Sequence, residues 1–157
     1  MLKISTKASV TISIILSIVF MVILIAGAVI MPWLSAMLVN FDDTVGIRKE
    51  ISQSGHIVIL IMAYLILACM ATADVLLMKL LFRVRAGLVF TTQSVGLIRG
   101  VSWCAILLGA VFAVLGYHFQ LSLFAAFACV FLGLCLRVVK NVIEQATEIK
   151  SENDFTI

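Results

Sequence analysis

Long apolar stretches, separated by short polar connections, dominate the pattern of the chain. Their cores span residues 12–33, 57–77, 95–115 and 121–139. Each is close to the ~20 residues that a helix needs to cross the hydrocarbon core of a bilayer. The pattern therefore predicts an all-α membrane protein with four transmembrane helices.

The composition agrees with a membrane environment. Hydrophobic residues make up 64% of the 157 residues and charged residues 12%, and the mean hydropathy is +1.25. Because about a quarter of the residues in a soluble domain are charged, this chain has too little polar surface to keep such a core dissolved. The spans leave room for one transmembrane domain, residues 1–157, and we expect the lipid bilayer to surround it.

The first stretch also has features of a secretory signal peptide. Lys3 and Lys7 precede it, and the small residues 26–28 resemble a cleavage site. Because the apolar run is long and continues past that site to Val39, we expect a retained transmembrane helix. Pro32 then lies near the outer end of the span, where the loss of one backbone donor does least harm.

The distribution of Lys and Arg predicts the topology. Nine of the eleven basic residues fall in the N-terminal segment, around the connection between the second and third spans, or in the C-terminal segment. Connections rich in Lys and Arg stay on the cytoplasmic side of the membrane. We therefore expect both termini in the cytoplasm.

The connections carry recognisable turn and cap signals. Thr91 or Thr92 is a candidate N-cap for the third helix, because a threonine hydroxyl can accept from an early backbone N–H. Gly87 marks a bend before that helix. Residues 116–119 form a tight turn, which predicts that the last two spans pair as an antiparallel hairpin.

Small residues recur at four-residue spacing in both spans of this hairpin. Such a pattern lets helix backbones approach closely and drives association in membranes. Its simplest use is to join the two spans, and dimerisation of the chain through one of these faces is the alternative. The residues are Ala105, Gly109 and Ala113 in the third span and Ala125, Cys129 and Gly133 in the fourth.

The fourth helix is expected to continue into the cytoplasm over residues 140–150, followed by a tail of residues 151–157. Lys140 and Glu144 are spaced as an i, i+4 ion pair. An apolar stripe follows another face of the helix, and we expect it to pack against its own chain. The alternatives are that a partner protein or the headgroup region covers it. The stripe consists of Leu132, Cys135, Val139, Val142, Ala146 and Ile149.

Asp74 is the single acidic residue within a span. Ionisable side chains are unfavourable in hydrocarbon and are functional candidates by default. Asp74 lies toward the cytoplasmic boundary, within reach of Arg83, Arg85 or Arg99, so a structural ion pair or hydrogen bond is the simpler interpretation. A proton- or cation-coupled transport site is the alternative.

Other chemistry-bearing residues give weaker signals. The four cysteines lie within spans without a Cys-x-x-Cys pair or a histidine at ligand spacing, so we expect them to pack as small apolar side chains and predict no metal or cofactor. His56 and His118 both map to the outer boundary, where solvation is a simpler interpretation than a shared site.

We find no catalytic constellation and predict that the protein is not an enzyme. Topology explains the basic middle connection better than nucleic-acid binding does.

Two segments resemble a known family. The segment from Arg85 to Val95 contains Gly-x-x-Phe-Thr and leads into Ile-Arg-Gly-Val-Ser-Trp at residues 98–103, and the chain ends Asn-Asp-Phe-Thr-Ile. With four spans and this length, the whole chain resembles the bacterial membrane family catalogued as domain of unknown function 2975, although Phe155 stands where Leu is expected. The resemblance implies a protein of the bacterial cytoplasmic (inner) membrane whose gene often lies beside one for a small helix-turn-helix regulator of the Cro/CI type. It supplies no catalytic residues.

These observations favour a non-enzymatic interaction or regulatory protein that acts through its cytoplasmic face. Its partner would be a cytosolic helix-turn-helix regulator or another membrane protein, and no direct contact with nucleic acid is expected. The alternatives are a small homo-oligomeric transporter that uses Asp74 and a bacteriocin-immunity-type membrane protein. The candidate functional residues are Asp74, Arg83, Arg85, Arg99, Asn153, Asp154 and Thr156.

Overall fold

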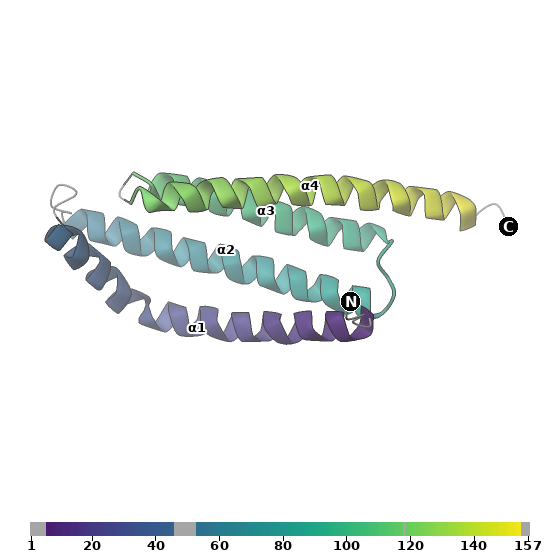
Figure 1. Ribbon diagram of the computed structural model, residues 1–157, viewed down its shortest axis with the longest axis horizontal. Coiled ribbons are helices and arrows are strands. Elements are labelled where there is room, and N and C mark those ends of the chain that lie inside the picture. Colours follow the sequence, from purple (N-terminus) through teal and green to yellow (C-terminus); the bar gives the residue numbers. More distant parts are fainter. Residues whose placement is uncertain (1–5, 46–52, 118, 155–157) are drawn as a thin grey trace, which may run out of the picture.

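The protein consists of four long helices that lie side by side in chain order (Figure 1). The structure is a computed structural model that describes residues 6–45, 53–117 and 119–154, with side chains for residues 8–37, 57–117 and 119–152. No strand occurs within these ranges. The helices are α1 (Thr6–Val45), α2 (Gln53–Arg85), α3 (Thr92–Leu115) and α4 (Leu121–Asp154).

All four helices are long and apolar enough to cross a membrane. This confirms the predicted fold class, an all-α protein with four membrane-spanning helices. Three of them are longer than a crossing requires, because α1, α2 and α4 have 40, 33 and 34 residues against the ~20 that span the hydrocarbon core. The helix α4 continues past the predicted end at Lys150 and stops at Asp154.

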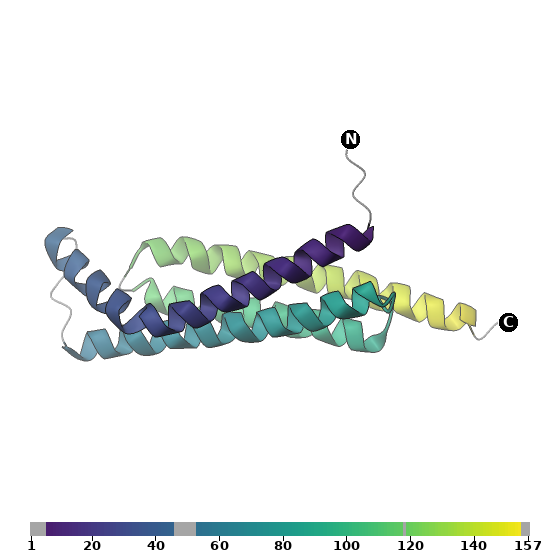
Figure 2. The same ribbon diagram turned by 90° about the horizontal axis from the view of Figure 1, so that it is seen from below.

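The helices form an open row rather than a closed bundle. Within the described residues, α1 packs on α2, α2 on α3 and α3 on α4, and α1 does not close against α4. Seen from below, α1 crosses obliquely in front of the other helices (Figure 2). Many large apolar side chains consequently stay exposed, including Ile25 on α1 and Phe127 on α4. A bilayer would cover these side chains, since lipid tails are as apolar as they are.

The helices α3 and α4 form the predicted hairpin. A Cβ atom added to Gly133 would lie 2.7 Å from Ile106 Cγ1 and 3.2 Å from the backbone oxygen of Ser102. A Cβ atom on Gly109 would lie 3.1 Å from the backbone oxygen of Ala126. The two backbones therefore approach so closely that a larger residue at either position would push its neighbours aside, which is how small residues favour helix association in membranes.

The helix α1 bends in its second half (Figure 1). Pro32 lies inside α1 and cannot donate a backbone hydrogen bond, which is a common cause of such bends. The hydroxyl of Ser35 donates to the backbone oxygen of Pro32 at 2.9 Å.

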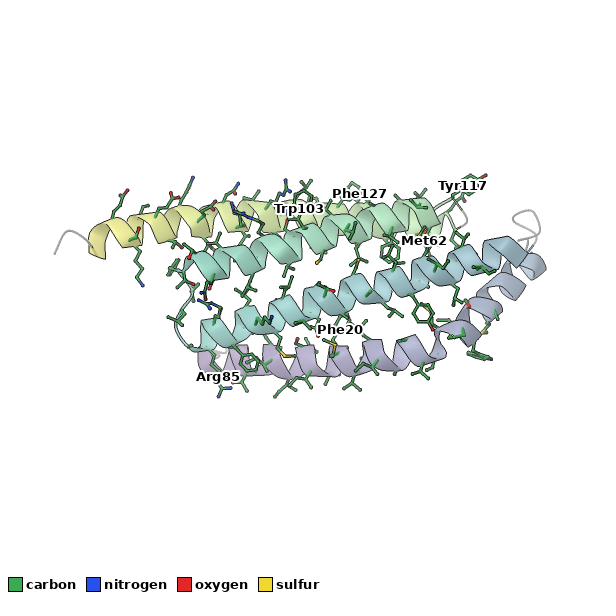
Figure 3. All side chains as sticks on the ribbon, turned by 180° about the vertical axis from the view of Figure 1, so that it is seen from behind. Phe20, Met62, Arg85, Trp103, Tyr117 and Phe127 are labelled. Carbon is green, nitrogen blue, oxygen red and sulfur yellow. The ribbon has the colours of Figure 1, made fainter. Side chains whose placement is uncertain are left out.

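The first helix begins and the last helix ends toward the same end of the molecule. The start of α1 and the α2–α3 connection lie toward one end of the molecule, and the end of α4 projects beyond them in the same direction (Figure 1), whereas Arg85 lies far from Tyr117 at the α3–α4 turn (Figure 3). The side chains of His56 and His118, which were weighed as a shared outer site, lie outside the described residues. We call the first end the basic end, because it carries Lys79, Arg83, Arg85, Arg99, Arg137 and Lys140.

Candidate functional sites

Asp74 is buried between helices, with 4% of its surface exposed. The hydroxyl of Ser17 on α1 donates to Asp74 Oδ1 at 2.6 Å, whereas Asp74 Oδ2 has no hydrogen-bond partner among the residues that the structure describes. The expected hydrogen bond is therefore present, but its donor is a serine of α1 and not an arginine. Arg83 lies nine residues further along α2, about 14 Å along the helix axis, and binds other groups.

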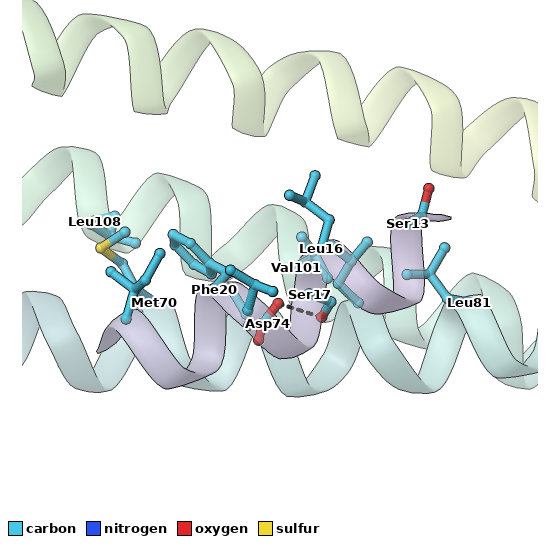
Figure 4. Close-up of a pocket in the computed structure, with 13 residues that line it drawn as sticks. Ser13, Leu16, Ser17, Phe20, Met70, Asp74, Leu81, Val101 and Leu108 are labelled. Atoms are coloured by element: carbon cyan, nitrogen blue, oxygen red, sulfur yellow. Dashed lines mark hydrogen bonds between the residues drawn. The ribbon is translucent and has the colours of Figure 1, made fainter. Parts of the chain in front are cut away.

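Asp74 and Ser17 line a pocket between α1, α2 and α3 (Figure 4). The pocket has a volume of about 630 Å³, and α1 and α2 supply most of its wall. Val101 and Leu108 of α3 complete the lining. Apart from Ser13, Ser17 and Asp74, the lining side chains are apolar. Asp74 therefore contributes one carboxyl group to a mostly apolar pocket.

Arg83 organises the connection between α2 and α3. Its guanidinium donates through Nε to Ser94 Oγ at 3.1 Å, through Nη2 to Thr91 Oγ1 at 3.0 Å and through Nη1 to Gln93 Oε1. A guanidinium presents several donors in a fixed planar fork, which suits it to hold three acceptors at once. Arg83 therefore fastens the last turn of α2 to the first turn of α3.

The same connection contains the segment on which the family resemblance rests. Gly87 has φ +76°, a backbone conformation that L side chains rarely adopt. Thr91 is the N-cap of α3, and its hydroxyl accepts from the backbone N–H of Ser94, which confirms the predicted cap and bend. The hydroxyl of Ser94 donates back to the backbone oxygen of Leu88 at 2.8 Å. In the Gly-x-x-Phe-Thr segment, the glycine thus allows the bend of the connection and the threonine caps α3.

A second set of charged contacts joins α3 to α4 near the basic end. Arg99 Nη2 lies 3.7 Å from Glu144 Oε1, and Lys140 binds the other carboxylate oxygen of Glu144 as the i, i+4 spacing predicts. The guanidinium carbon of Arg137 lies 4.4 Å from the ring centroid of Trp103, within the range of a cation–π interaction. These contacts hold the extended part of α4 against the first turns of α3.

The apolar stripe of α4 is not covered by its own chain. Val142 and Ile149 each remain 60% exposed, and Leu132, Cys135 and Val139 are exposed as well. The expectation that this stripe packs against its own chain is therefore wrong for these residues. The reason is geometric, because the face of α4 that meets α3 carries Lys140 and Glu144, and the stripe lies on a different side of the helix.

Comparison with known families adds one firm relationship. The family model described as "Protein of unknown function (DUF2975)" matches residues 11–157, nearly the whole chain. The chain belongs to the DUF2975 family. No curated protein and no solved structure matched it.

The remaining candidate residues of this DUF2975 member differ in how they are placed. Arg85 is exposed at the end of α2, where Figure 3 shows it at the basic end. The backbone of Asn153 and Asp154 continues α4. Their side chains, and the whole of Thr156, lie outside the described residues.

The cysteines occupy different environments along the helices of this family member. Cys69 is buried, Cys104 and Cys129 are half-buried, and Cys135 is exposed on the face of α4 that lipid would cover. Within the described residues no three His, Cys, Asp or Glu side chains come together as a metal site.

The sequence alone did not identify two of the buried polar contacts. Ser17 appeared only as one polar residue in the apolar run of α1, and its pairing with Asp74 depends on how α1 lies on α2. Ser102, which is buried, donates to the backbone oxygen of Gly133 at 2.8 Å. In both cases the available signal was a serine inside an apolar helix, which needs an acceptor somewhere nearby.

Proposed function

We propose that this protein is a non-enzymatic membrane protein that binds a cytosolic regulatory partner at its basic end. The observation that carries the proposal is the uncovered apolar stripe on the extension of α4. Val142 and Ile149 are 60% exposed there, beyond the ~20 residues from Leu121 that cross the bilayer. Exposed apolar side chains in contact with water favour an interaction surface.

The proposed orientation places the basic end in the cytoplasm of a bacterium. Lys79, Arg85 and Arg137 lie near the level at which the helices leave the apolar region. Basic residues at such positions are retained on the cytoplasmic side, where they also attract anionic lipid headgroups. This orientation puts both termini and the α4 extension in contact with cytosolic proteins.

The extension is suited to display a surface because it is held in place. The hairpin contacts at Gly133 and the ion pair between Arg99 and Glu144 hold α4 against α3. A surface that is ordered before binding loses less conformational entropy when the partner docks. The stripe would therefore act as a preformed helical ridge rather than as a segment that folds on binding.

The proposed partner is the small helix-turn-helix regulator whose gene the family resemblance places nearby. Regulatory pairing would recruit that protein to the membrane or release it, and the membrane protein itself would not touch nucleic acid. The tail that follows Asp154 is the second proposed contact, because it continues directly from the displayed helix.

Co-purification of the full chain with this regulator, after co-expression, tests the proposal. We expect Val142→Asp combined with Ile149→Asp to lower the yield of complex at least about tenfold, since two buried apolar contacts would be replaced by desolvated charges. Deletion of residues 151–157 should lower it further.

The control is Asn141→Asp, which adds one negative charge one residue from Val142 and therefore about 100° around the helix, and it is compared with the single variant Val142→Asp as well as with the double variant. It should leave the yield of complex unchanged. An unchanged yield for the double variant and for the deletion would refute the proposed surface.

A small transporter is the second candidate function, and the buried Asp74 in its pocket is the observation that favours it. Such a transporter would act as a homo-oligomer, because four helices enclose little volume. It requires Asp74→Asn to abolish proton- or cation-driven uptake in vesicles. Flux and resistance equal to those of the wild type would remove this candidate.

A further inference from the structure

Asp74 Oδ2 is a buried polar atom without a partner in the described part of the chain. Asp74 is 4% exposed, and the hydroxyl of Ser17 satisfies only its other oxygen. If the side chain is ionised, Oδ2 is an acceptor that lacks a donor. If it is protonated, the free O–H or the free oxygen still lacks a partner within the protein. Buried polar atoms without a partner are unfavourable and rare. The unpartnered oxygen of Asp74 therefore indicates that a hydrogen-bonding group from another molecule binds next to it.

The space next to this carboxyl group is large enough to hold that missing group. The pocket of about 630 Å³ lies in the usual range of small-molecule sites, ~300–1,000 Å³. Figure 4 shows Asp74 among apolar side chains from three helices. These apolar side chains include Leu16, Phe20, Met70, Leu77, Val101 and Leu108.

The side chains that line the pocket indicate which chemical class of ligand it can bind. A bare inorganic cation such as Mg²⁺ or Ca²⁺ requires about six oxygen ligands, whereas the lining side chains with oxygen are Ser13, Ser17 and Asp74. The hydroxyl of Ser13 already donates to the backbone oxygen of Ser9 at 3.1 Å. The site therefore offers one carboxyl group with an unpartnered oxygen within an extended apolar wall, which matches a molecule with one cationic donor and an apolar body.

We propose that this pocket binds a lipophilic organic amine, whose protonated nitrogen donates a hydrogen bond to Asp74 Oδ2 while its apolar body fills the space between α1, α2 and α3. An N⁺–H to carboxylate hydrogen bond is among the stronger ones in proteins. A hydrogen bond of this kind is stronger in apolar surroundings than in water. This inference does not depend on the proposed function at the basic end, and it holds whether or not the bound amine is moved across the membrane.

Radiolabelled dodecylamine is a suitable probe, with the full chain in lipid nanodiscs and empty nanodiscs as the background. We expect saturable binding that exceeds the background. Dodecanol has the same chain without the charge, and dodecyltrimethylammonium has the charge without an N–H donor. Both should compete at least about tenfold more weakly than dodecylamine, because each lacks one half of the interaction with Asp74.

Two variants separate the carboxyl group from the shape of the pocket. Asp74→Asn should weaken saturable binding at least about tenfold. Ala73→Phe, which fills the pocket and leaves the carboxyl group in place, should also abolish it. Asp74→Leu serves as a second variant, because it leaves no unpartnered oxygen and is expected to fold at least as well as the wild type.

Ser9→Ala is the matched control, because its side chain does not line the pocket and its backbone oxygen, which accepts from Ser13, is retained. It should bind dodecylamine as the wild type does. Binding confined to the background level, equal binding by folded Asp74→Leu, or equal competition by dodecanol or by dodecyltrimethylammonium would each overturn the proposal.

Discussion

The two halves of the molecule are held together in different ways. In the α3–α4 hairpin the backbones nearly touch, so that a Cβ atom on Gly133 would lie 3.2 Å from the backbone oxygen of Ser102. Between α1 and α2 the contacts are made by side chains. A Cβ atom on Gly27 of α1 would make an ordinary contact of 3.7 Å with Leu67, and the phenol of Tyr64 reaches across to donate to the backbone oxygen of Ala28 at 3.1 Å.

The difference shows where a site can form. In the α3–α4 hairpin the backbones approach closely at Gly109 and Gly133, and the buried hydroxyl of Ser102 has its acceptor. Looser packing of α1 on α2 leaves a pocket that two residues of α3 help to line, and Asp74 within it retains an oxygen without a partner among the described residues. We therefore regard the hairpin as the rigid support for the α4 extension, and the α1–α2 pair as the part that can accept a ligand.

The largest effect is expected from Gly133→Ala. The new methyl group would lie 2.7 Å from Ile106 Cγ1 and 3.2 Å from the backbone oxygen of Ser102, so that the Ile106 side chain and the α3 backbone must both shift, and such overpacking lowers the free energy of unfolding by about 3 kcal/mol. Unfolding with SDS in mixed micelles, followed by circular dichroism, measures this quantity. Gly27→Ala is the control and should change it by less than about 1 kcal/mol, in the stabilising direction, since alanine favours helices. Equal losses for both variants would contradict the contrast between the halves.

A somewhat smaller and more local effect is expected from Arg83→Ala, at the junction between the halves. Removal of the hydrogen bonds to Thr91, Gln93 and Ser94 should lower stability by about 2 kcal/mol. Hydrogen exchange should rise mainly in the connection around Gly87. Arg85→Ala, an exposed arginine on the same turn, should have little effect. If exchange rose equally throughout α1 and α4, the junction would not be a separate local unit.

The smallest effects should have opposite signs in the two halves. Ser102→Ala removes a satisfied hydrogen bond in the hairpin and should lower the free energy of unfolding by about 1 kcal/mol. Asp74→Leu removes an unpartnered oxygen and should leave this energy unchanged or raise it by about 1 kcal/mol. Ser17 can then donate to a backbone oxygen of its own helix. The same SDS titration compares the two variants, and a loss for Asp74→Leu larger than that for Ser102→Ala would mean that Asp74 supports the fold.

Local patterns were sufficient to predict most of the fold. The four spans follow from the length of the apolar stretches, and the cap at Thr91 and the bend at Gly87 follow from residue types with particular backbone preferences. The hairpin could be predicted because two small-residue patterns are joined by a short turn, which leaves the spans little choice of partner. Each of these features depends on residues close in the sequence.

The candidate sites could not be predicted in the same way, because they depend on the rotation of each helix against its neighbour. Asp74 was recognised as unusual, but its pairing with Ser17 and its pocket require α1 to lie across α2 at one particular rotation. The stripe through Val142 and Ile149 was recognised too. Its assignment to the interior was wrong because α4 presents a different face, with Lys140 and Glu144, to α3.

The account rests most heavily on the claim that the rigid hairpin displays a contact surface on α4. Site-specific photocrosslinking in intact cells tests it most directly, with a photoreactive residue at Ile149 on the stripe or at the neighbouring Glu148, which is exposed on another face. The account predicts that the probe at residue 149 forms a covalent adduct with the helix-turn-helix regulator and that the probe at residue 148 forms far less. Adducts only with lipid at residue 149, or equal adducts at both positions, would contradict it.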